Sequence, residues 1–413
     1  MQAWIESQVI GSPLDWISRA VLTRRLAWGV VARWLVRVGV VAFAIGGCGL
    51  AGLTGLAGCS HAGSAGDHPD ARAPDARQFT VDGPNLDVSV APRFLCQTAR
   101  PEGAPQPEPP PLTAGCPALV SGVNHLTSTG HDRNFILVLP TDPQPGETFP
   151  VLFMWHWIGG SANGFLEKGE VQAAADDQRF IAVIPNAEGA TVLATSFNTK
   201  WPFDITQTPD RMTEEFTFFD DMLSCVEQQF TVNQDCVSTV GVSAGALFTD
   251  QLAQARSNRL SSFISLSGGV NATIIKPWTG ATHKLPAVVL WGGDGPPAMD
   301  GVKDILGCAG IGMDFSVASR DLETGLEHDG HFFIECRHNC GHVEPPLDPP
   351  PGESKYAGMW EFALDHPFWL APGQSPWAQA LPSSLPSWCG IGANSETPRS
   401  GSGCPAAENP CVE

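Results

Sequence analysis

The sequence predicts an α/β protein built on a doubly wound, mostly parallel β-sheet. Two observations support this prediction. Between Cys116 and about Leu370, apolar runs alternate with amphipathic segments. Several apolar runs, such as 180–185 and 285–293, are almost uninterrupted, as expected for strands that helices cover on both faces. A region of about 250 residues fits one large domain of this kind.

Strands and helices are expected to alternate along this region. The β-branched and apolar runs predict strands at 134–140, 150–157, 180–185, 236–243, 261–269, 285–293 and 331–336. The amphipathic runs predict helices at 165–178, 214–230, 244–257, 315–330 and 355–368.

The flanking segments differ in composition from this region. Residues 59–115 are rich in Pro, Ala and Gly, and the run PEGAPQPEPPP predicts a stiff, extended tether. The last segment is turn-rich and contains three cysteines. We therefore expect four parts, namely an export signal at 1–58, a tether at 59–115, the α/β domain at 116–372 and a tail at 373–413.

The N-terminus has the layout of an export signal. Five arginines precede an uncharged run, VGVVAFAIGGCGLAGLTGLAGC, which ends at Cys59. Its end, LAGC, resembles the bacterial lipoprotein signal, and this resemblance implies cleavage before Cys59, lipidation of that cysteine and attachment to a membrane. An uncleaved anchor or simple secretion is the alternative, and Cys48 is a second, poorer cleavage point. All three alternatives, a lipoprotein, an uncleaved anchor and a secreted protein, place the rest of the chain outside the cytoplasm.

The charge of the chain excludes one class of partner. The net charge is −20, and because residues 1–58 contribute +3, the remainder carries −23. A surface this acidic repels phosphate backbones, so we expect no nucleic-acid partner.

The cysteines indicate disulfide bonds. Ten of the twelve remain when Cys48 and Cys59 are left out, and an even number in an oxidising compartment favours pairing. We expect Cys225 to pair with Cys236 across a short helix-to-strand connection, and Cys96 to pair with Cys116.

A zinc site is the competing interpretation of one stretch rich in histidine and cysteine. Imidazole and thiolate groups bind zinc, but no spacing here matches a zinc finger. Cysteines outside the cytoplasm are also more readily oxidised than metal-bound. We therefore expect no metal and no organic cofactor. The residues concerned are His328, His331, Cys336, His338, Cys340 and His342.

The pentapeptide GVSAG around Ser243 matches the G-x-S-x-G pattern of a nucleophile. In a chain with 44 glycines such a match is weak alone, so its surroundings decide. CVSTV provides a strand before the serine and ALFTDQLAQA a helix after it, which is the required strand-turn-helix context. Gly241 and Gly245 would leave room for neighbouring backbone at the strained turn.

A serine nucleophile needs a base beside it and an acid that orients the base. In the α/β-hydrolase fold the order along the chain is serine, acid, histidine, each after a strand. Asp294 follows the strand predicted at 285–293, and His342 follows the strand predicted at 331–336. These two residues are the candidate acid and base.

The oxyanion hole is expected from backbone N–H groups. One is that of Ala244, directly after the nucleophile, and the other is that of Trp157 or Ile158, after an early strand. His156 is expected to orient this loop by hydrogen bonding.

Three aromatic residues are candidates for an apolar acyl or aryl pocket. They are Trp157, Trp201 and Phe203, for which ordinary core packing is the equal alternative.

Together these motifs resemble the secreted polyhydroxybutyrate depolymerase, feruloyl esterase and acetylxylan esterase group of α/β-hydrolases. The resemblance rests on HWIGGSA, VIPNAEG, GVSAG, LSGG and GHVEPP. It implies an α/β-hydrolase fold and the triad Ser243, Asp294 and His342. Because WGGDG is one residue short of the H-G-x-x-D pattern of the group, Asp300 and Asp304 are alternatives for the acid.

Two other departures concern residue size. Ala246 stands where the group has a further glycine, and Trp157 and Ile158 are bulky for an oxyanion loop.

The sequence thus predicts an exported serine esterase that works through an acyl-enzyme. By the resemblance, its ester substrate is either polymeric hydroxyalkanoate or a feruloyl or acetyl ester of plant polysaccharide. The alternatives are a non-catalytic surface binding protein on a hydrolase scaffold and a serine peptidase of the same fold.

Overall fold

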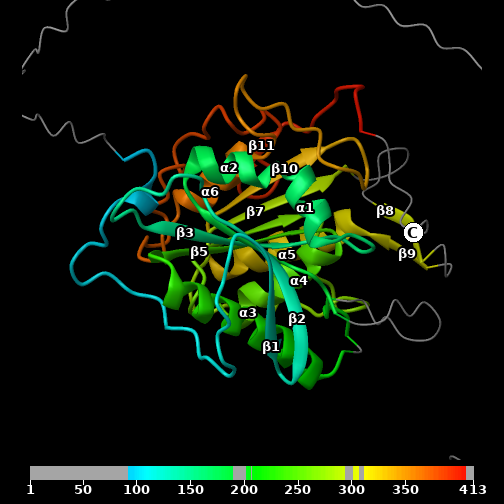
Figure 1. Cartoon of the computed structure of the whole chain (residues 1–413). Helices are drawn as coiled ribbons and strands as arrows, with labels where there is room; N and C mark the ends of the chain where they lie inside the picture. The colour runs from blue at the N-terminus through cyan, green and yellow to red at the C-terminus, as the bar shows by residue number, and fades with distance from the viewer. Residues whose placement is uncertain (1–91, 189–200, 206, 294–300, 307–310, 406–413) are drawn as a thin grey trace, which may run out of the picture. The chain divides into compact units, whose positions relative to one another are not determined.

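A nine-stranded, mostly parallel sheet forms the centre of the chain (Figure 1). The structure is a computed structural model that describes residues 92–188, 201–205, 207–293, 301–306 and 311–405. The predicted export signal and the predicted lipidation site, Cys59, lie outside these residues. None of the described helices has the length and apolar character needed to cross a membrane.

The strands follow the order β1-β2-β4-β3-β5-β6-β7-β10-β11 across the sheet. Pairing is parallel from β4 through β10, and β1, β2 and β11 are antiparallel to their neighbours. The strands are β1 (Gly122–Ser128), β2 (His131–Val138), β3 (Phe149–Trp155), β4 (Ile181–Pro185), β5 (Val232–Val242), β6 (Ser262–Leu266), β7 (Ala287–Gly292), β10 (Phe333–His338) and β11 (Cys389–Ile391). A separate antiparallel pair consists of β8 (Gly301–Leu306) and β9 (Ile311–Asp314).

Helices cover both faces of the large sheet. Figure 1 shows α1, α2 and α6 over one face and α3, α4 and α5 under the other, and each set of helices shares a separate apolar cluster with the sheet. This arrangement confirms the predicted doubly wound sheet of the α/β-hydrolase type. The helices are α1 (Ala162–Lys168), α2 (Val171–Gln178), α3 (Pro209–Gln229), α4 (Ala244–Ala255), α5 (Phe315–Asp329) and α6 (Ala357–Leu364), after a short 3-10 helix at Leu95–Gln97.

The helix predicted at 165–178 is divided into two. A Cβ on Gly169 would lie 2.8 Å from the Phe165 carbonyl oxygen, and Glu170 has a left-handed φ of 49°. The chain therefore turns between α1 and α2. The edge strands β1 and β11 and the β8–β9 pair were not predicted, because none of them contains the uninterrupted apolar run that identified the core strands.

The disulfides correct both predicted pairings. Cys96 is bonded to Cys236, and Cys116 is bonded to Cys225, with Cα–Cα distances of 6.0 and 5.3 Å. Proximity along the chain suggested that Cys225 would pair with Cys236. Instead, the cysteine of α3 and the cysteine of β5 each bond to the N-terminal segment that crosses them.

The N-terminal segment is bound to the α/β domain from residue 93 onward. Asp221 of α3 accepts hydrogen bonds from the backbone N–H and the hydroxyl of Thr113, at 2.7 and 3.0 Å. Asp365 accepts from the Leu95 N–H at 3.1 Å. Residues 93–115, which composition assigned to the tether, therefore pack on the domain where the structure describes them.

Two disulfides bind the C-terminal tail to β10 and to the loop after it. Cys336 is bonded to Cys389, and Cys340 to Cys404. Neither Cys336 nor Cys340 is therefore a thiolate available to zinc, which removes the two sulfur ligands of the alternative metal site.

A buried carboxyl group lies beneath the end of β7. Glu323 of α5 is 3% exposed and accepts a hydrogen bond from the Trp291 indole N–H at 3.0 Å. Burial, reinforced by the nearby Glu335, raises the pKa of Glu323 to about 9.

Stability is expected to fall as the pH rises from 7 to 9. In this range folded Glu323 keeps a proton that the unfolded chain has released, so the unfolding free energy decreases by up to about 1.4 kcal/mol per pH unit. The buried His283 and His366, with pKa values of about 4, affect stability only below about pH 6.5. Urea unfolding at pH 7, 8 and 9 measures the slope of the unfolding free energy against pH.

Glu323→Gln keeps an acceptor for Trp291 and should flatten this slope. Glu327→Gln is the matched control, because Glu327 lies exposed on the same helix and should leave the slope unchanged. Equal slopes for wild type and Glu323→Gln would contradict the assignment.

Candidate active site

Ser243 lies at a sharp turn between β5 and α4, at the carboxyl edge of the parallel strands. Its φ of 55° is unusual for a residue with a side chain, and strained backbone of this kind is typical of functional sites. The Ser243 N–H donates to the Leu266 carbonyl of β6 at 2.9 Å, which ties the turn to the neighbouring strand.

The two glycines of the pentapeptide are required by close backbone contacts. A Cβ on Gly241 would lie 2.2 Å from the Gly245 carbonyl oxygen, and a Cβ on Gly245 would lie 2.0 Å from the Trp155 carbonyl oxygen. No side chain fits at either position. The turn and the end of β3 are therefore in direct backbone contact, with no side chain between them.

His342 reaches the serine from the loop after β10. Its Nε2 lies 2.9 Å from the Ser243 hydroxyl, a hydrogen-bonding distance. Gly341, with a φ of 73°, turns the chain directly before the histidine. The ring stacks on Phe315, the first residue of α5, with centroids 4.2 Å apart. The structure thus brings together the serine and histidine expected from the sequence.

The third expected member of the triad is not described. Asp294 and Asp300 lie outside the described residues, and Asp304 belongs to β8. The identity of the acid therefore stays a prediction.

The end of β7 contacts the segment that carries the histidine. A Cβ on Gly292 would lie 2.4 Å from the Gly341 carbonyl oxygen. The Gly293 N–H donates to the His338 carbonyl. The chain therefore leaves β7 directly beside the loop of His342.

His156 organises the loop after β3. The Ala187 N–H donates to its Nε2 at 3.2 Å, so Nδ1 carries the hydrogen and donates to the Trp157 carbonyl at 2.8 Å. The Trp201 indole N–H donates to the His156 carbonyl at 2.9 Å. These bonds agree with the loop-orienting role expected for His156.

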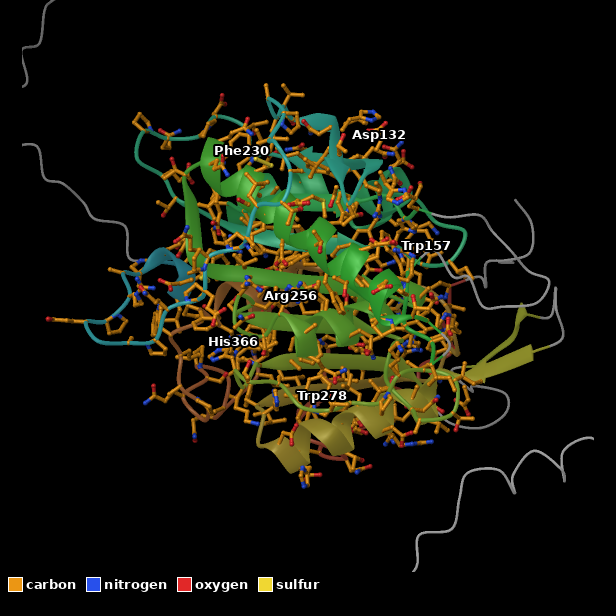
Figure 2. All side chains as sticks on the ribbon, turned by 90° about the horizontal axis from the view of Figure 1, so that it is seen from below. Asp132, Trp157, Phe230, Arg256, Trp278 and His366 are labelled. Atoms are coloured by element: carbon orange, nitrogen blue, oxygen red, sulfur yellow. A yellow bond between two sulfur atoms is a disulfide. The ribbon has the colours of Figure 1, made fainter. Side chains whose placement is uncertain are left out.

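The residues expected to donate to the oxyanion follow strands that end at this edge of the sheet. Ala244 is the first residue of α4, so its N–H has no carbonyl partner within the helix. Trp157 and Ile158 follow directly on the end of β3, which touches Gly245. In Figure 2, Trp157 lies toward the end of the domain that carries β8 and β9, and His366 lies toward the opposite end.

Trp201 and Phe203 do not line a described cavity. They are 1% and 2% exposed and belong to the core on the α3–α5 face. Trp201 packs edge-on against Trp155 with ring centroids 5.1 Å apart. Both side chains therefore pack in the core, as the alternative raised for them describes, whereas Trp157 borders a cavity among the described residues.

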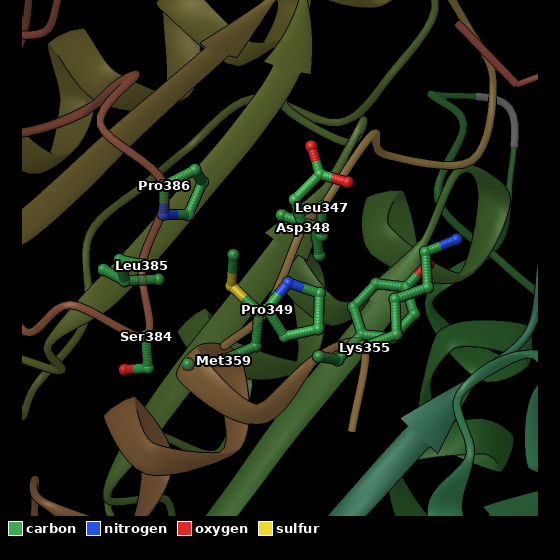
Figure 3. A pocket seen from close by; sticks show the side chains of 10 residues that line it. Leu347, Asp348, Pro349, Lys355, Met359, Ser384, Leu385 and Pro386 are labelled. Carbon is green, nitrogen blue, oxygen red and sulfur yellow. The ribbon is translucent and has the colours of Figure 1, made fainter. Parts of the chain in front are cut away.

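Two cavities lie beside α6. The first opens to solvent, and its walls are Trp157, Phe165, Lys168, Gly169, Val242, Leu266, Tyr356 and Trp360. The second shares Tyr356 with it and is bordered by the loop after His342, by α6 and by the tail (Figure 3). The first includes Val242, the residue directly before the nucleophile.

Sequence reasoning missed Phe315, Tyr356 and Trp360. Each is an aromatic residue of a predicted helix, and the periodicity of such a helix assigns it to the core. No sequence signal distinguishes a core aromatic residue from one that supports a catalytic ring or borders a cavity.

The chain has measurable but distant similarity to known proteins. No family model matches it. Two curated relatives, each named "Probable feruloyl esterase C", come from Aspergillus terreus and Aspergillus oryzae and are 24% and 25% identical over 163 residues. The match covers 38% of this chain and 54% of each relative. The chain thus spans about half the length of the curated relatives it matches.

Solved structures share the fold. The structure named "Crystal Structure of sOPH Native" has a TM-score of 0.51 at 16% identity, covering 69% of this chain and 99% of that chain. "Crystal Structure of pOPH Native" has a TM-score of 0.50 at 17% identity, covering 68% and 97%. At this level of identity the similarity concerns the fold alone.

Gly245→Ala should reduce the reactivity of Ser243 toward a fluorophosphonate probe by about a hundredfold or more. The added Cβ must displace backbone at both the turn and the end of β3, and a shift of about 1 Å in a reacting group has an effect of this size. The labelling rate of the purified variant measures it. Gly164→Ala is the matched control, because its Cβ meets only ordinary contacts at 3.5 Å. Equal labelling rates for both variants would contradict the packing argument.

Proposed function

We propose that this protein is an exported serine esterase that hydrolyses carboxylic esters. The observation that supports the proposal is the 2.9 Å contact between His342 Nε2 and the Ser243 hydroxyl, at a strained turn between a strand and a helix. The names of the curated relatives point in the same direction.

The proposed reaction has two halves. His342 Nε2 takes the proton of Ser243 as the serine oxygen attacks the ester carbonyl carbon. The carbonyl oxygen becomes negative and accepts hydrogen bonds from the N–H of Ala244 and of Trp157 or Ile158. When the intermediate collapses, His342 returns the proton to the leaving alcohol. A water molecule deprotonated by His342 then attacks the acyl-enzyme, releases the acid and restores the serine.

We assign the role of triad acid to Asp294. Gly293 is hydrogen-bonded to the His338 carbonyl, and Asp294 is the next residue along the chain. This contact joins the last described residue before Asp294 to the segment that carries His342, which supports the assignment. A carboxylate at Nδ1 would hold the imidazole in the tautomer that leaves Nε2 free to accept the serine proton.

Two more specific proposals concern the substrate of the esterase and its location in the cell envelope. Polymeric hydroxyalkanoate and feruloyl or acetyl esters of plant polysaccharide are the candidate substrates, and lipidation at Cys59 is the candidate mode of membrane attachment. The four disulfides among the described residues support export, because such bonds persist in oxidising compartments. A panel of insoluble polyhydroxybutyrate, methyl ferulate and acetylated xylan separates the substrates.

Ser243→Ala should abolish labelling by a fluorophosphonate probe and lower kcat for 4-nitrophenyl acetate by about 10⁴-fold or more, since it removes the nucleophile. His342→Ala should have a similar effect on kcat, because the serine then lacks its base. Thr249→Ala, a small buried change on the same helix, is the folding control. A wild-type chain that resists the probe would favour the surface binding protein. Cleavage of peptides in place of esters would favour the peptidase.

Asp294→Asn should lower kcat by about 10³- to 10⁴-fold with little effect on the melting temperature, because the amide favours the wrong imidazole tautomer. Asp300→Asn and Asp304→Asn should stay within about threefold of wild type. Near-normal activity of Asp294→Asn, together with loss of activity in one of the other two variants, would move the assignment to that residue.

A further inference from the structure

The histidine loop, residues 339–343, is bound covalently to the C-terminal tail. Cys340, two residues before His342, forms a disulfide with Cys404. Two residues of chain span at most about 7 Å, so a bond that holds Cys340 also limits where His342 can lie. The tail therefore contributes to the position of the histidine that contacts the serine.

Arg399 of the tail adds hydrogen bonds to this connection. Its backbone N–H donates to the Arg337 carbonyl of β10 at 3.0 Å, and its guanidinium donates to the Asn339 side-chain oxygen at 2.7 Å. The guanidinium also donates to the carbonyls of Gly401 and Gly403, at 2.9 and 2.6 Å. The Asn339 amide donates to the Gly401 carbonyl at 2.9 Å. One cation thus bonds the histidine loop and the tail at the same time.

The Cys340–Cys404 bond differs from the other described disulfides in its exposure to solvent. Cys404 is exposed and Cys340 is partly exposed. Each of the other three disulfides that the structure describes contains a cysteine that is at most 1% exposed, namely Cys225, Cys236 or Cys336. Thiol–disulfide exchange requires access to a sulfur atom. A reductant in solution should therefore reach Cys340–Cys404 before these three bonds.

A dithiol reductant opens such a bond in two steps. One thiolate of the reductant attacks the sulfur of Cys404, forms a mixed disulfide and expels Cys340 as a thiolate. The second thiol then displaces Cys404, so the dithiol gives up two electrons, becomes a cyclic disulfide and passes its two protons to the cysteines. The Arg399 guanidinium lies 3.4 Å from the Cys340 sulfur, and its positive charge stabilises the thiolate that leaves.

We infer that the tail positions His342 through Cys340–Cys404 and Arg399, and that a dithiol reductant lowers the activity by opening this bond. The inference rests on the proposed function and adds a form of regulation to its active site. The tail stays attached to β10 through Cys336–Cys389 and β11, so the fold persists while the histidine loop loosens. A shift of about 1 Å in a reacting group lowers the rate by about a hundredfold, so partial loosening is measurable.

Graded reduction of the oxidised wild-type protein tests the inference. After brief treatment with dithiothreitol, one half of the sample is desalted and assayed, and the other half is alkylated for peptide mass spectrometry. Cys340 and Cys404 should be alkylated first, and kcat for 4-nitrophenyl acetate should fall by about tenfold in parallel. KM should stay within about twofold, because His342 acts on the reacting atoms. Reoxidation of the desalted half with oxidised glutathione should restore kcat.

Variants of the tail separate positioning from general stability. Cys404→Ser removes the bond, so its kcat should match that of the reduced wild type and should not respond to dithiothreitol. Arg399→Ala should lower kcat by about threefold or more at unchanged KM, and Arg399→Lys, which keeps the charge, should recover part of the loss. Arg100→Ala is the matched control. Arg100 also joins a flanking segment to the sheet, here through Asp235 in the first half of β5, and its loss should leave kcat unchanged.

The outcomes distinguish this inference from the proposed function. An active wild type whose kcat stays within about twofold once Cys340 and Cys404 are fully reduced would overturn the inference and leave the esterase standing. A loss of activity that follows the reduction of other cysteines would do the same. If Cys404→Ser does not fold, the reduced wild type and Arg399→Ala provide the same test. Failure of the oxidised wild type to hydrolyse any ester would overturn the proposed function, and this inference with it.

Discussion

The candidate site depends on direct contact between backbone segments at the carboxyl edge of the sheet. Gly245 lies against the end of β3, and Gly292 lies against the segment that carries His342. At both contacts a single Cβ would overlap backbone atoms that have no room to move. These contacts fix the relative positions of the nucleophile turn, the oxyanion loop and the histidine loop, and the 2.9 Å distance from Ser243 to His342 follows from them.

The two faces of the sheet support different parts of the site. On the α3–α5 face, Phe315 holds the imidazole by stacking. On the opposite face, α1 and α6 enclose the cavity beside the nucleophile. Ser243 lies at the end of the strand between these two layers.

Disulfides fix the segments that precede and follow the α/β domain. Cys96–Cys236 and Cys116–Cys225 bind the N-terminal segment to β5 and α3, and Cys336–Cys389 binds the tail to β10. Each bond closes a long loop of chain, which lowers the entropy of the unfolded state. The tail also adds β11 to the edge of the sheet. The N-terminal segment and the tail, whose composition predicted a tether and a turn-rich end, therefore belong to the folded unit where the structure describes them.

The sequence by itself determined the fold class, the main strands and helices and the turn at Ser243, and it predicted that His342 would meet this serine. These depend on local patterns: apolar period, glycine at a tight turn, and motif order along the chain. Only the tertiary structure decided the disulfide partners, the core positions of Trp201 and Phe203, and the cavity with Trp360. These depend on which distant segments meet. The periodicity of a strand or helix specifies which of its faces is buried, but not which residue, sulfur or empty space lies opposite.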